Sequence, residues 1–190
     1  MSAHTVKWQE MSHNFKIQHE KPIALVGLMG AGKTTIGKKL AKYLSIDFFD
    51  TDEEIEKTIG KKIPIIFSTF GEKTFREYEK KVIKTIFSGR PAVVATGGGA
   101  FMDADTRALI NNTGISIWIK ADIETLVKRI DEDGTRPLLK NQKKRDVLEH
   151  LISERYPIYS KADITIISKI EPIEKTLQRL ISALEKGSVR

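Results

Sequence analysis

The sequence predicts an α/β fold in which a five-stranded parallel sheet lies between two layers of helices, a three-layer αβα arrangement. Five short apolar runs alternate with longer amphipathic stretches from residue 21 onward, and no internal repeat or linker rich in proline and glycine divides the chain. Short apolar runs without polar alternation are typical of parallel strands that helices cover on both faces. With 190 residues, the chain has the length of one such domain.

The predicted strands are the apolar runs. In chain order they span residues 23–26, 46–49, 92–95, 115–119 and 164–167. Between and after them, apolar residues recur every three or four positions, which is the period of a helix with one buried face. These helical stretches span residues 36–44, 75–87, 126–130, 147–152 and 173–184. Ligands of such folds bind beyond the carboxyl ends of the strands, so functional residues are expected just after each run.

The composition excludes several classes of protein. Cysteine is absent, which excludes disulfides, thiolate zinc sites and a cysteine nucleophile, and suits the reducing cytoplasm, where we expect the protein. No apolar run approaches the roughly 18 residues of a membrane span. The chain holds 32 Lys and Arg against 25 Asp and Glu, a net charge of +7. This surplus predicts an anionic partner, which could be a nucleic acid, an acidic membrane or a small phosphorylated ligand.

Residues 1–20 show no sustained periodicity, and we expect them to form a flexible extension of a domain that spans residues 21–190. They lack the apolar centre of a secretory signal and the Arg and Ser bias of a transit peptide. Three of the four histidines lie in this segment, at His4, His13 and His19. Their irregular spacing argues against a metal site.

A phosphate-binding motif follows the first predicted strand. Residues 27–34 read GLMGAGKT and match G-x-x-x-x-G-K-[ST] between a strand and a helix. Glycines let backbone amides close around phosphate oxygens, and the helix that begins near Lys33 directs its positive end at the anion. A tight turn alone would explain Gly27 and Gly32, but not Lys33 followed by Thr34. The motif therefore predicts nucleotide binding, with Lys33 on the terminal phosphates and the Thr34 hydroxyl on Mg²⁺.

Other classes of phosphate-loop protein fit the sequence less well. A GTPase would need a D-x-x-G element and an N/T-K-x-D base reader, each following a strand. The two similar segments, 131–134 and 160–163, follow a helical stretch and precede the last strand, respectively. A motor or helicase would need more chain for its coupling parts. A small-molecule kinase is the class that remains.

Two aspartates, Asp50 and Asp52, follow the second predicted strand. If the strand continues, both carboxylates face the ligand crevice, because residues two apart in a strand point the same way. One could then hold Mg²⁺ through water while the other accepts the proton of a substrate hydroxyl. The alternative is that Asp52 and its acidic neighbours merely favour a helix N-terminus. Spacing alone leaves both interpretations open.

Further candidates lie in the central part of the chain. Arg76 and Glu79 are three residues apart on a predicted helix, so Glu79 can orient the guanidinium, although a surface salt bridge is the simpler interpretation. Three consecutive glycines at 97–99 follow the third strand, and their cost in chain entropy favours close approach of the backbone to a ligand. The polar stretch 131–144 is long for a connection and predicts a mobile lid.

Together these segments resemble the shikimate kinase family, over about residues 23–167. The resemblance rests on the segments GLMGAGKTTIGKKLA, FFDTD, IFSTFGEKTFREYE, ATGGGA, TRPLL and ERYPIYSKAD, which occur in the family's order and at similar separations. The phosphate loop is widespread, but the set as a whole is specific. It implies a P-loop kinase fold with a mobile lid, and transfer of a phosphoryl group from ATP, with Mg²⁺, to the 3-hydroxyl of shikimate on the route to chorismate.

The resemblance also implies roles for residues at the nucleotide. Lys33 and Thr34 would serve phosphate and magnesium, and Asp50 would lie near the metal. Arg129 would pack on adenine, and Arg136 would reach the transferring phosphoryl group from the lid. The loop itself would be lined by Gly30, Ala31, Gly32, Lys33, Thr34 and Thr35. Threonine at position 34 departs from the usual serine of the family but keeps the hydroxyl.

On the substrate side, the resemblance implies that Asp52 binds the substrate hydroxyls and acts as catalytic base. Arg76 and Arg155 would hold the substrate carboxylate, a planar task suited to guanidinium groups. The pocket would be completed by the backbone amides of Gly98 and Gly99 and by walls from Phe67 and Phe75. From residue spacing alone, Arg129, Arg136 and Arg155 could equally be solvated surface charges.

Two alternatives to a shikimate kinase are open to test. A related small-molecule kinase would act on gluconate or a nucleoside monophosphate, but a nucleotide would offer no carboxylate to Arg76 and Arg155. A nucleic-acid-dependent ATPase would need a contiguous basic face with stacking aromatic residues. The lysine clusters are instead dispersed along the chain, and aromatic residues make up 7% of it. We therefore expect a monomeric enzyme with a small-molecule substrate and no nucleic-acid or membrane partner.

Overall fold

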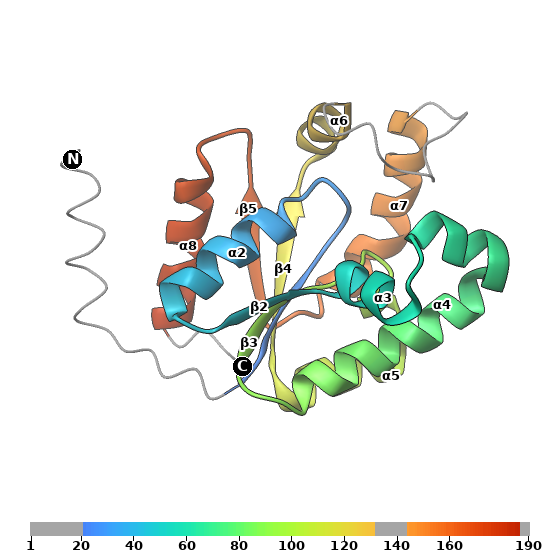
Figure 1. Ribbon diagram of the computed structural model, residues 1–190. Coiled ribbons are helices and arrows are strands. Elements are labelled where there is room, and N and C mark those ends of the chain that lie inside the picture. The colour runs from blue at the N-terminus through green and yellow to red at the C-terminus, as the bar shows by residue number, and fades with distance from the viewer. Residues whose placement is uncertain (1–20, 132–143, 187–190) are drawn as a thin grey trace, which may run out of the picture.

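A five-stranded parallel sheet forms the centre of the protein (Figure 1). The structure is a computed structural model that describes residues 21–131 and 144–186. The strands lie in the order β2-β3-β1-β4-β5, and all four neighbouring pairs are parallel. Their bounds are β1 Ile23–Val26, β2 Asp47–Asp50, β3 Ala92–Ala95, β4 Ile115–Ala121 and β5 Ile164–Ser168. The predicted α/β fold is confirmed, and the five apolar runs are its five strands.

Helices cover both faces of the sheet, which gives three layers (Figure 1). On one face α2 packs against α8, and on the other α4 packs against α5. The helices are α2 Lys33–Leu44, α3 Thr51–Ile59, α4 Ile63–Phe87, the 3₁₀ turn η1 Ala100–Met102, α5 Ala104–Thr113, α6 Ile123–Asp131, α7 Lys144–Tyr159 and α8 Ile173–Glu185. The predicted extension 1–20, with its three histidines, and residues 132–143 of the predicted lid, with Arg136, lie outside the described residues.

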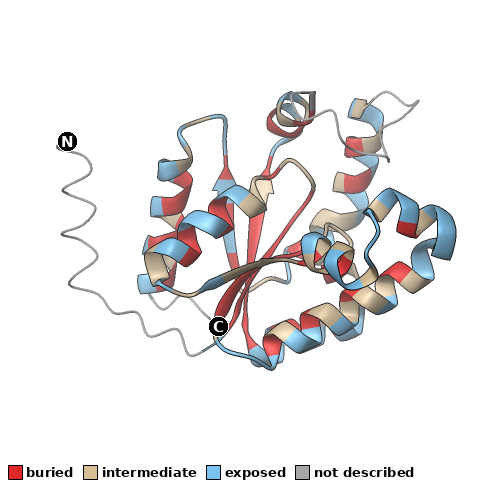
Figure 2. Ribbon diagram, viewed as in Figure 1, coloured by how far each residue is buried: buried red, intermediate tan, exposed pale blue. Residues whose placement is uncertain are grey.

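The core is built from the strands themselves. All four residues of β1 and all four of β3 are buried, which is the pattern expected of central parallel strands (Figure 2). Helices add further apolar side chains, among them the fully buried Phe101 and Tyr159. A second, smaller cluster lies beneath α3 and α4, where Ile55, Ile66 and Phe75 pack together. These two clusters fix α3 and α4 beside the carboxyl ends of the strands.

Helix α4 contains a break that the apolar periodicity does not reveal. Gly71 has φ 78° and ψ 168°, so the chain leaves helical geometry there and resumes it in the next turn. A side chain at this position would meet no neighbour within 4 Å, so glycine is needed for the backbone angle and not for space. The segment after the break carries Arg76 and Glu79, which the sequence analysis placed on a helix that starts near Lys73.

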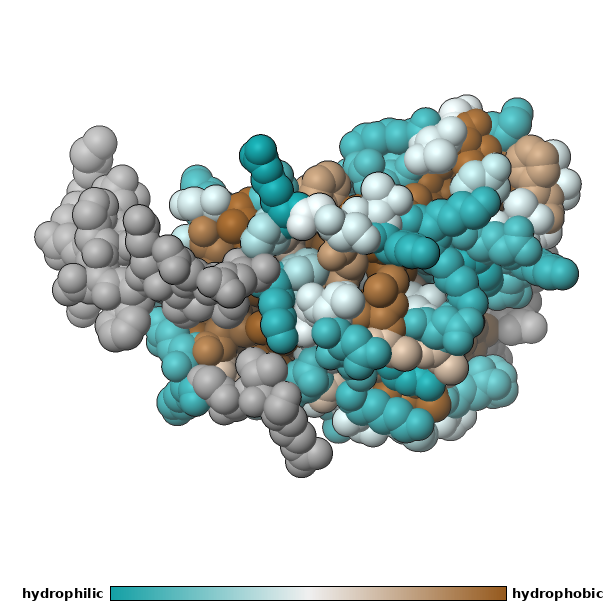
Figure 3. Space-filling view, turned by 90° about the horizontal axis from the view of Figure 1, so that it is seen from below, coloured by the Kyte–Doolittle hydropathy of each residue, from teal (hydrophilic) through white to brown (hydrophobic). Residues whose placement is uncertain are grey.

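The described surface is largely polar. In the view from below, hydrophilic side chains cover most of the surface and the apolar ones form small separate groups (Figure 3). Four large apolar side chains are exposed in the described ranges, namely Ile65, Phe70, Ile167 and Ile170. Among residues 21–131 and 144–186, no helix has the length and apolar character needed to cross a membrane.

A half-buried carboxylate, that of Asp163, joins β4 to the start of β5. Asp163 precedes β5, and its Oδ2 accepts hydrogen bonds from the Ser116 amide at 2.8 Å and the Ser116 hydroxyl at 2.7 Å. The Asp163 amide in turn donates to the Ser116 hydroxyl oxygen at 2.9 Å. Ser116 is fully buried on β4, one residue before the ladder to β5 begins at Ile117. The Asp163 side chain therefore takes the place of a missing strand neighbour.

Replacing Asp163 with alanine should lower the free energy of unfolding by about 1–3 kcal/mol, because it leaves the buried amide of Ser116 without an acceptor. Urea denaturation followed by circular dichroism measures the loss. Asp163→Asn is the matched control, since it keeps one carbonyl oxygen and should lose less. An alanine variant as stable as the wild type would contradict this role for Asp163.

Candidate active site

A pocket of about 200 Å³ lies beyond the carboxyl ends of β1, β2 and β3. This is the position that the parallel topology predicts for a ligand. It is lined by Met29, Lys33, Thr34, Asp50, Asp52, Ile63, Phe67, Phe75, Arg76, Glu79, Thr96, Gly97, Gly98, Gly99 and Arg155. The segments that follow three different strands therefore meet in one cavity, together with side chains from α4 and α7.

The loop between β1 and α2 has the geometry of an anion cradle. Gly32 adopts φ 98° at the N-terminus of α2, where no side chain caps the helix and the first turn holds no acidic residue. The first amides of α2 are thus available to an anion, and the helix dipole favours negative charge there. Gly27 has φ 138°, and a Cβ on it would lie 2.7 Å from the backbone oxygen of Ile119. Glycine is required at both positions.

Lys33 lies over this loop. Its ammonium donates hydrogen bonds to the backbone oxygens of Gly27 at 2.8 Å and Leu28 at 2.9 Å. The lysine therefore places a positive charge at the mouth of the cradle, next to the amides that would receive phosphate oxygens. Gly30 and Ala31 lie in the loop itself, and Thr35 lies in the first turn of α2.

Asp50 links this loop to the second strand. The Thr34 hydroxyl donates to Asp50 Oδ2 at 2.8 Å, and the Asp52 amide donates to Asp50 Oδ1 at 3.1 Å. Asp50 is the last residue of β2 and caps α3, so Asp52 lies in the first turn of that helix and not on a continued strand. Of the two arrangements that spacing left open, the structure has the helix start and not the continued strand, because Asp50 itself ends the strand by capping the helix. Even so, Asp50 and Asp52 both line the pocket.

The oxygens of Thr34 and Asp50 fit a magnesium ion bound to a nucleotide. Magnesium in kinases takes only one or two protein oxygens and completes its shell with phosphate oxygens and water. A hydroxyl and a carboxylate oxygen 2.8 Å apart beside the anion cradle are ligands of this kind. In the described part of the chain, no group of three or more His, Asp or Glu residues could hold a metal ion.

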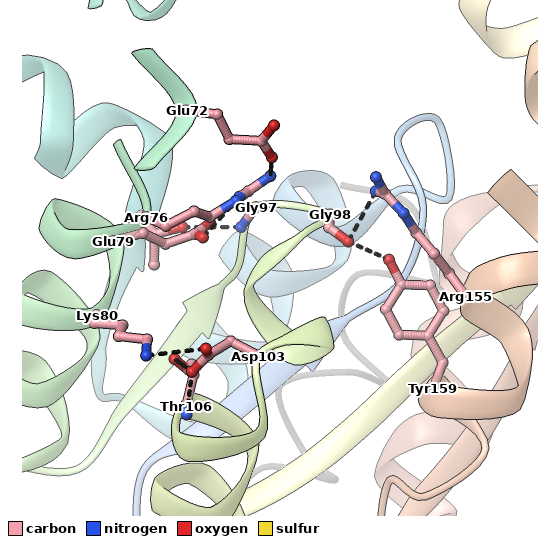
Figure 4. Close-up of polar contacts among 11 residues, drawn as sticks. Glu72, Arg76, Glu79, Lys80, Gly97, Gly98, Asp103, Thr106, Arg155 and Tyr159 are labelled. Carbon is pink, nitrogen blue, oxygen red and sulfur yellow. Dashed lines mark hydrogen bonds and ion pairs between the residues drawn. The ribbon is translucent and has the colours of Figure 1, made fainter. Parts of the chain in front are cut away.

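Arg76 and Glu79 form a partly buried ion pair (Figure 4). Arg76 Nη1 donates to Glu79 Oε2 at 2.8 Å, and Nη2 donates to the exposed Glu72 at 3.0 Å. Glu79 is only 2% exposed. Surface salt bridges do not bury a carboxylate to this degree, so the simpler interpretation of this pair is wrong. Glu79 fixes the direction in which the guanidinium enters the pocket.

The two partners respond differently to burial. Burial raises the pKa of Glu79, and the attraction of Arg76 offsets this only in part, while the nearby Asp52 raises it further. Burial acts against the charge of Arg76, but Glu79 and Glu72 outweigh it and raise its pKa. Glu79 Oε1 is buried without a hydrogen-bond partner among the described residues. The site therefore holds a carboxylate that is costly to bury and that the guanidinium keeps in place.

The three glycines after β3 bring the backbone close to these side chains. A Cβ on Gly97 would lie 2.5 Å from Glu79 Oε1 and 2.9 Å from Asp52 Oδ1, so the two carboxylates lie beside the bare Cα of Gly97. A Cβ on Gly99 would collide with the guanidinium of Arg76. The glycines are therefore needed for close approach to charged side chains of the pocket. The close approach to a ligand that the sequence analysis expected stays a prediction.

Helix α7 closes the opposite side of the glycine loop. Arg155 Nη1 donates to the Gly98 carbonyl at 3.1 Å, and the hydroxyl of Tyr159 donates to the same oxygen (Figure 4). Arg155 and Arg76 thus lie on opposite sides of the glycine loop and both line the pocket. Phe67 and Phe75 form an apolar wall, with ring centroids 4.6 Å apart.

Arg129 lies at the rim of the phosphate loop and not among the residues that line the pocket. Its Nη1 donates to the Ala31 oxygen at 3.1 Å and to Ser168 Oγ at 3.0 Å, and its Nη2 donates to the Lys169 oxygen at 2.6 Å. The arginine thus connects the phosphate loop to the end of β5. Its predicted contact with adenine stays a prediction.

The sequence analysis missed three pocket or loop contacts, those of Met29, Ile63 and Tyr159. Tyr159 had a usable signal, because it follows Arg155 by four residues and so shares its face of the helix. Met29 and Ile63 had none, since an apolar residue in a loop or at a helix start is common and carries no chemical pattern.

The fold and the pocket define a phosphate-loop phosphotransferase for a small acceptor. An anion cradle with a lysine, a carboxylate and two arginines line the same pocket. The family model described as shikimate kinase matches residues 29–185. The chain belongs to the shikimate kinase family.

Individual relatives agree with this assignment. A shikimate kinase of Paramagnetospirillum magneticum is 48% identical over 164 residues, which are 86% of this chain and 84% of that protein. One of Bartonella henselae is 42% identical over 165 residues, 87% of this chain and 79% of that protein. Among solved structures, shikimate kinase from Acinetobacter baumannii in complex with shikimate has a TM-score of 0.86 at 34% identity, covering 94% of this chain and 99% of that one.

Substituting Glu79 with glutamine should change how stability depends on pH. Burial raises the Glu79 pKa above its ordinary value of 4.5, so the folded protein holds this proton more tightly than the unfolded chain. The contribution of Glu79 to the free energy of unfolding is therefore greatest below the unfolded pKa and falls as pH rises through the folded pKa. Relative to the wild type, the melting temperature of Glu79→Gln should rise between about pH 4 and pH 7.

Differential scanning fluorimetry over this pH range measures the difference between the two proteins. Glu72→Gln is the matched control, because Glu72 binds the same guanidinium from an exposed position. A Glu79→Gln difference that is the same at every pH would show that the Glu79 pKa is not raised in the folded protein.

Proposed function

We propose that this enzyme transfers the γ-phosphoryl group of ATP to the 3-hydroxyl of shikimate, giving shikimate 3-phosphate and ADP, as a step of chorismate and aromatic amino acid biosynthesis. The observation that carries the proposal is the pocket of about 200 Å³, which is lined by an anion cradle, a carboxylate and two arginines. Shikimate has hydroxyls for the carboxylate and a carboxylate for the arginines. Family membership supports the same acceptor.

On the nucleotide side, the first amides of α2 and the Lys33 ammonium receive the β- and γ-phosphates. Thr34 and Asp50 would hold the magnesium ion, which would neutralise charge on the phosphates. The loop residues Gly30, Ala31, Gly32 and Thr35 surround the phosphates. Arg129 packs on the adenine, and Arg136 reaches the transferring phosphoryl group from the lid at 131–144.

On the acceptor side, Arg76 and Arg155 hold the shikimate carboxylate. Both line the pocket, and Arg76 is directed there by Glu79 at 2.8 Å. Guanidinium groups suit this task because their planar donors match a carboxylate. Gly98 and Gly99 offer backbone amides to the substrate, and the wall of Phe67 and Phe75 packs against the ring.

Asp52 binds the acceptor hydroxyl and takes its proton as the new O–P bond forms. Its carboxylate lines the pocket together with Lys33 and Thr34, and it lies next to Gly97. Phosphoryl transfer asks little covalent chemistry of the protein, so positioning and charge neutralisation supply most of the acceleration. Lys33 and Arg136 stabilise the charge that develops on the transferring group.

The proposal extends to the setting of the reaction. We infer that residues 21–190 form one kinase domain and that the enzyme acts as a monomer in the cytoplasm, without a nucleic-acid or membrane partner. The main alternative acceptor is gluconate, which also carries a carboxylate beside hydroxyls. A nucleoside monophosphate fits less well, because it lacks a carboxylate for Arg76 and Arg155.

Among shikimate, gluconate, AMP and single-stranded DNA, only shikimate should stimulate ADP release from Mg²⁺-ATP. A coupled assay of ADP, with each addition in turn and an assay without acceptor as control, measures this. Stimulation by another addition, with none by shikimate, would overturn the proposed function.

Replacing Asp52 with asparagine should lower kcat by roughly 100-fold or more, because the amide cannot accept the hydroxyl proton. The Kd for ATP, measured by isothermal titration calorimetry, should stay within about twofold of the wild type, since the phosphate cradle is unchanged. Asp47→Asn, at the exposed start of β2, is the matched control. Near-normal turnover of the Asp52 variant would remove Asp52 as the base.

A further inference from the structure

Tyr159 is the fully buried residue of α7 whose hydroxyl contacts the glycine loop, residues 97–99. The residue is fully buried, and its hydroxyl donates to the carbonyl oxygen of Gly98 (Figure 4). Arg155, one turn earlier on the same helix, donates to the same oxygen at 3.1 Å. The Gly98 carbonyl thus receives two donors, both from α7.

The ring of Tyr159 cannot easily leave this position. It packs in an aromatic cluster with Trp118 and Tyr156, with centroid distances of 6.0 Å and 6.4 Å. Burial raises the pKa of Tyr159 to about 12, against the opposing effect of Arg155. The hydroxyl therefore keeps its proton and remains a donor throughout the neutral pH range.

Holding the Gly98 carbonyl also sets the direction of the next amide. The peptide between Gly98 and Gly99 is planar and trans, so its C=O and N–H point in opposite directions. With the carbonyl directed to α7, the Gly99 N–H points away from α7. Gly99 lines the pocket and lies against the guanidinium of Arg76, and no backbone oxygen of the described residues accepts a hydrogen bond from its N–H.

Glycine makes such an anchor necessary. Three consecutive glycines have the largest freedom of backbone rotation, and no side chain of the loop itself can fix the peptide plane. Arg155 alone is a weak anchor under the proposed function, because the same guanidinium also binds the substrate carboxylate. The Tyr159 hydroxyl interacts with the Gly98 carbonyl and with Arg155, and under the proposed function it binds no part of the substrate.

We propose that Tyr159 is a positioning residue for the acceptor: its hydroxyl fixes the Gly98–Gly99 peptide so that the Gly99 N–H faces the substrate before the substrate binds. This inference rests on the proposed function, since it assigns the amide to shikimate. The tyrosine itself does not touch the substrate. Its effect passes through the backbone of the glycine loop.

The test compares Tyr159→Phe with Tyr156→Phe in steady-state kinetics. Tyr156 is the matched control because it lies on the same helix and in the same aromatic cluster, and its hydroxyl also donates to a backbone oxygen, that of Ala121. Tyr159→Phe should raise the KM for shikimate about fivefold to tenfold and leave the KM for ATP within about twofold. Tyr156→Phe should leave both constants within about twofold.

Each variant loses one hydrogen bond from a tyrosine hydroxyl to a backbone oxygen, so both melting temperatures should fall. A loss of stability alone would therefore not explain a KM change in one variant only. An unchanged KM for shikimate in Tyr159→Phe, or equal increases in both variants, would overturn the proposal. A wild type inactive on shikimate would instead overturn the proposed function, which keeps the two failures distinct.

A measurement on the wild type alone provides a second test. By ¹⁵N relaxation without ligand, the Gly99 amide should have an order parameter near that of rigid backbone, about 0.85. A value below about 0.6 would show that the peptide is not held in advance and would overturn the proposal. On addition of shikimate without nucleotide, the Gly99 amide proton should shift in the wild type and shift less in Tyr159→Phe. Equal shifts would also contradict it.

Discussion

The parallel pairing of three strands is the constraint on which the pocket depends. Asp50 of β2 lies opposite Ala95 of β3, and Ala95 lies opposite Leu25 of β1. Because the strands run the same way and end at the same level, the phosphate loop, the aspartate pair and the glycine loop leave the sheet side by side. A slip of one residue in this register would turn Asp50 to the other face of the sheet. Every residue of β1 and β3 is buried, so such a slip would disturb close packing on both faces of the sheet.

Much of this arrangement was predictable from the sequence. The apolar runs gave the five strands, and the phosphate-loop motif gave the position of Lys33 and Thr34, because both signals are local in the chain. The aspartates are an instructive case. From the sequence, Asp50 and Asp52 could lie on a continued strand or at the start of a helix. In the structure Asp50 belongs to both elements, because it ends β2 and caps α3. A side chain that accepts a hydrogen bond from a nearby backbone amide competes with the hydrogen bonds between strands. The apolar pattern of the sequence does not show which of the two wins.

Other features depended on contacts between distant parts of the chain. The spacing of Arg76 and Glu79 predicts that they meet, but the burial of Glu79 follows from the packing of Gly97 and Asp52 against it. The break at Gly71 sets the position of Arg76, and a lone glycine in a helical pattern does not specify a backbone angle. The hydroxyl of Tyr159 meets Gly98 across 61 residues. The roles of individual residues came from the family resemblance and not from periodicity.

The electrostatics of Arg76 suit a site that must hold an anion and release it. Its two ion pairs differ in burial: the Glu79 side chain is 3% exposed and that of Glu72 is 67% exposed. An exposed pair contributes about 0–1 kcal/mol, so a substrate carboxylate can replace Glu72 at little cost. Breaking the pair with Glu79 would strand a buried charge, which costs far more. In the proposed role, Glu79 therefore keeps the guanidinium of Arg76 in place. The Nη2 end of Arg76, which binds Glu72, would bind the substrate carboxylate instead and later release it.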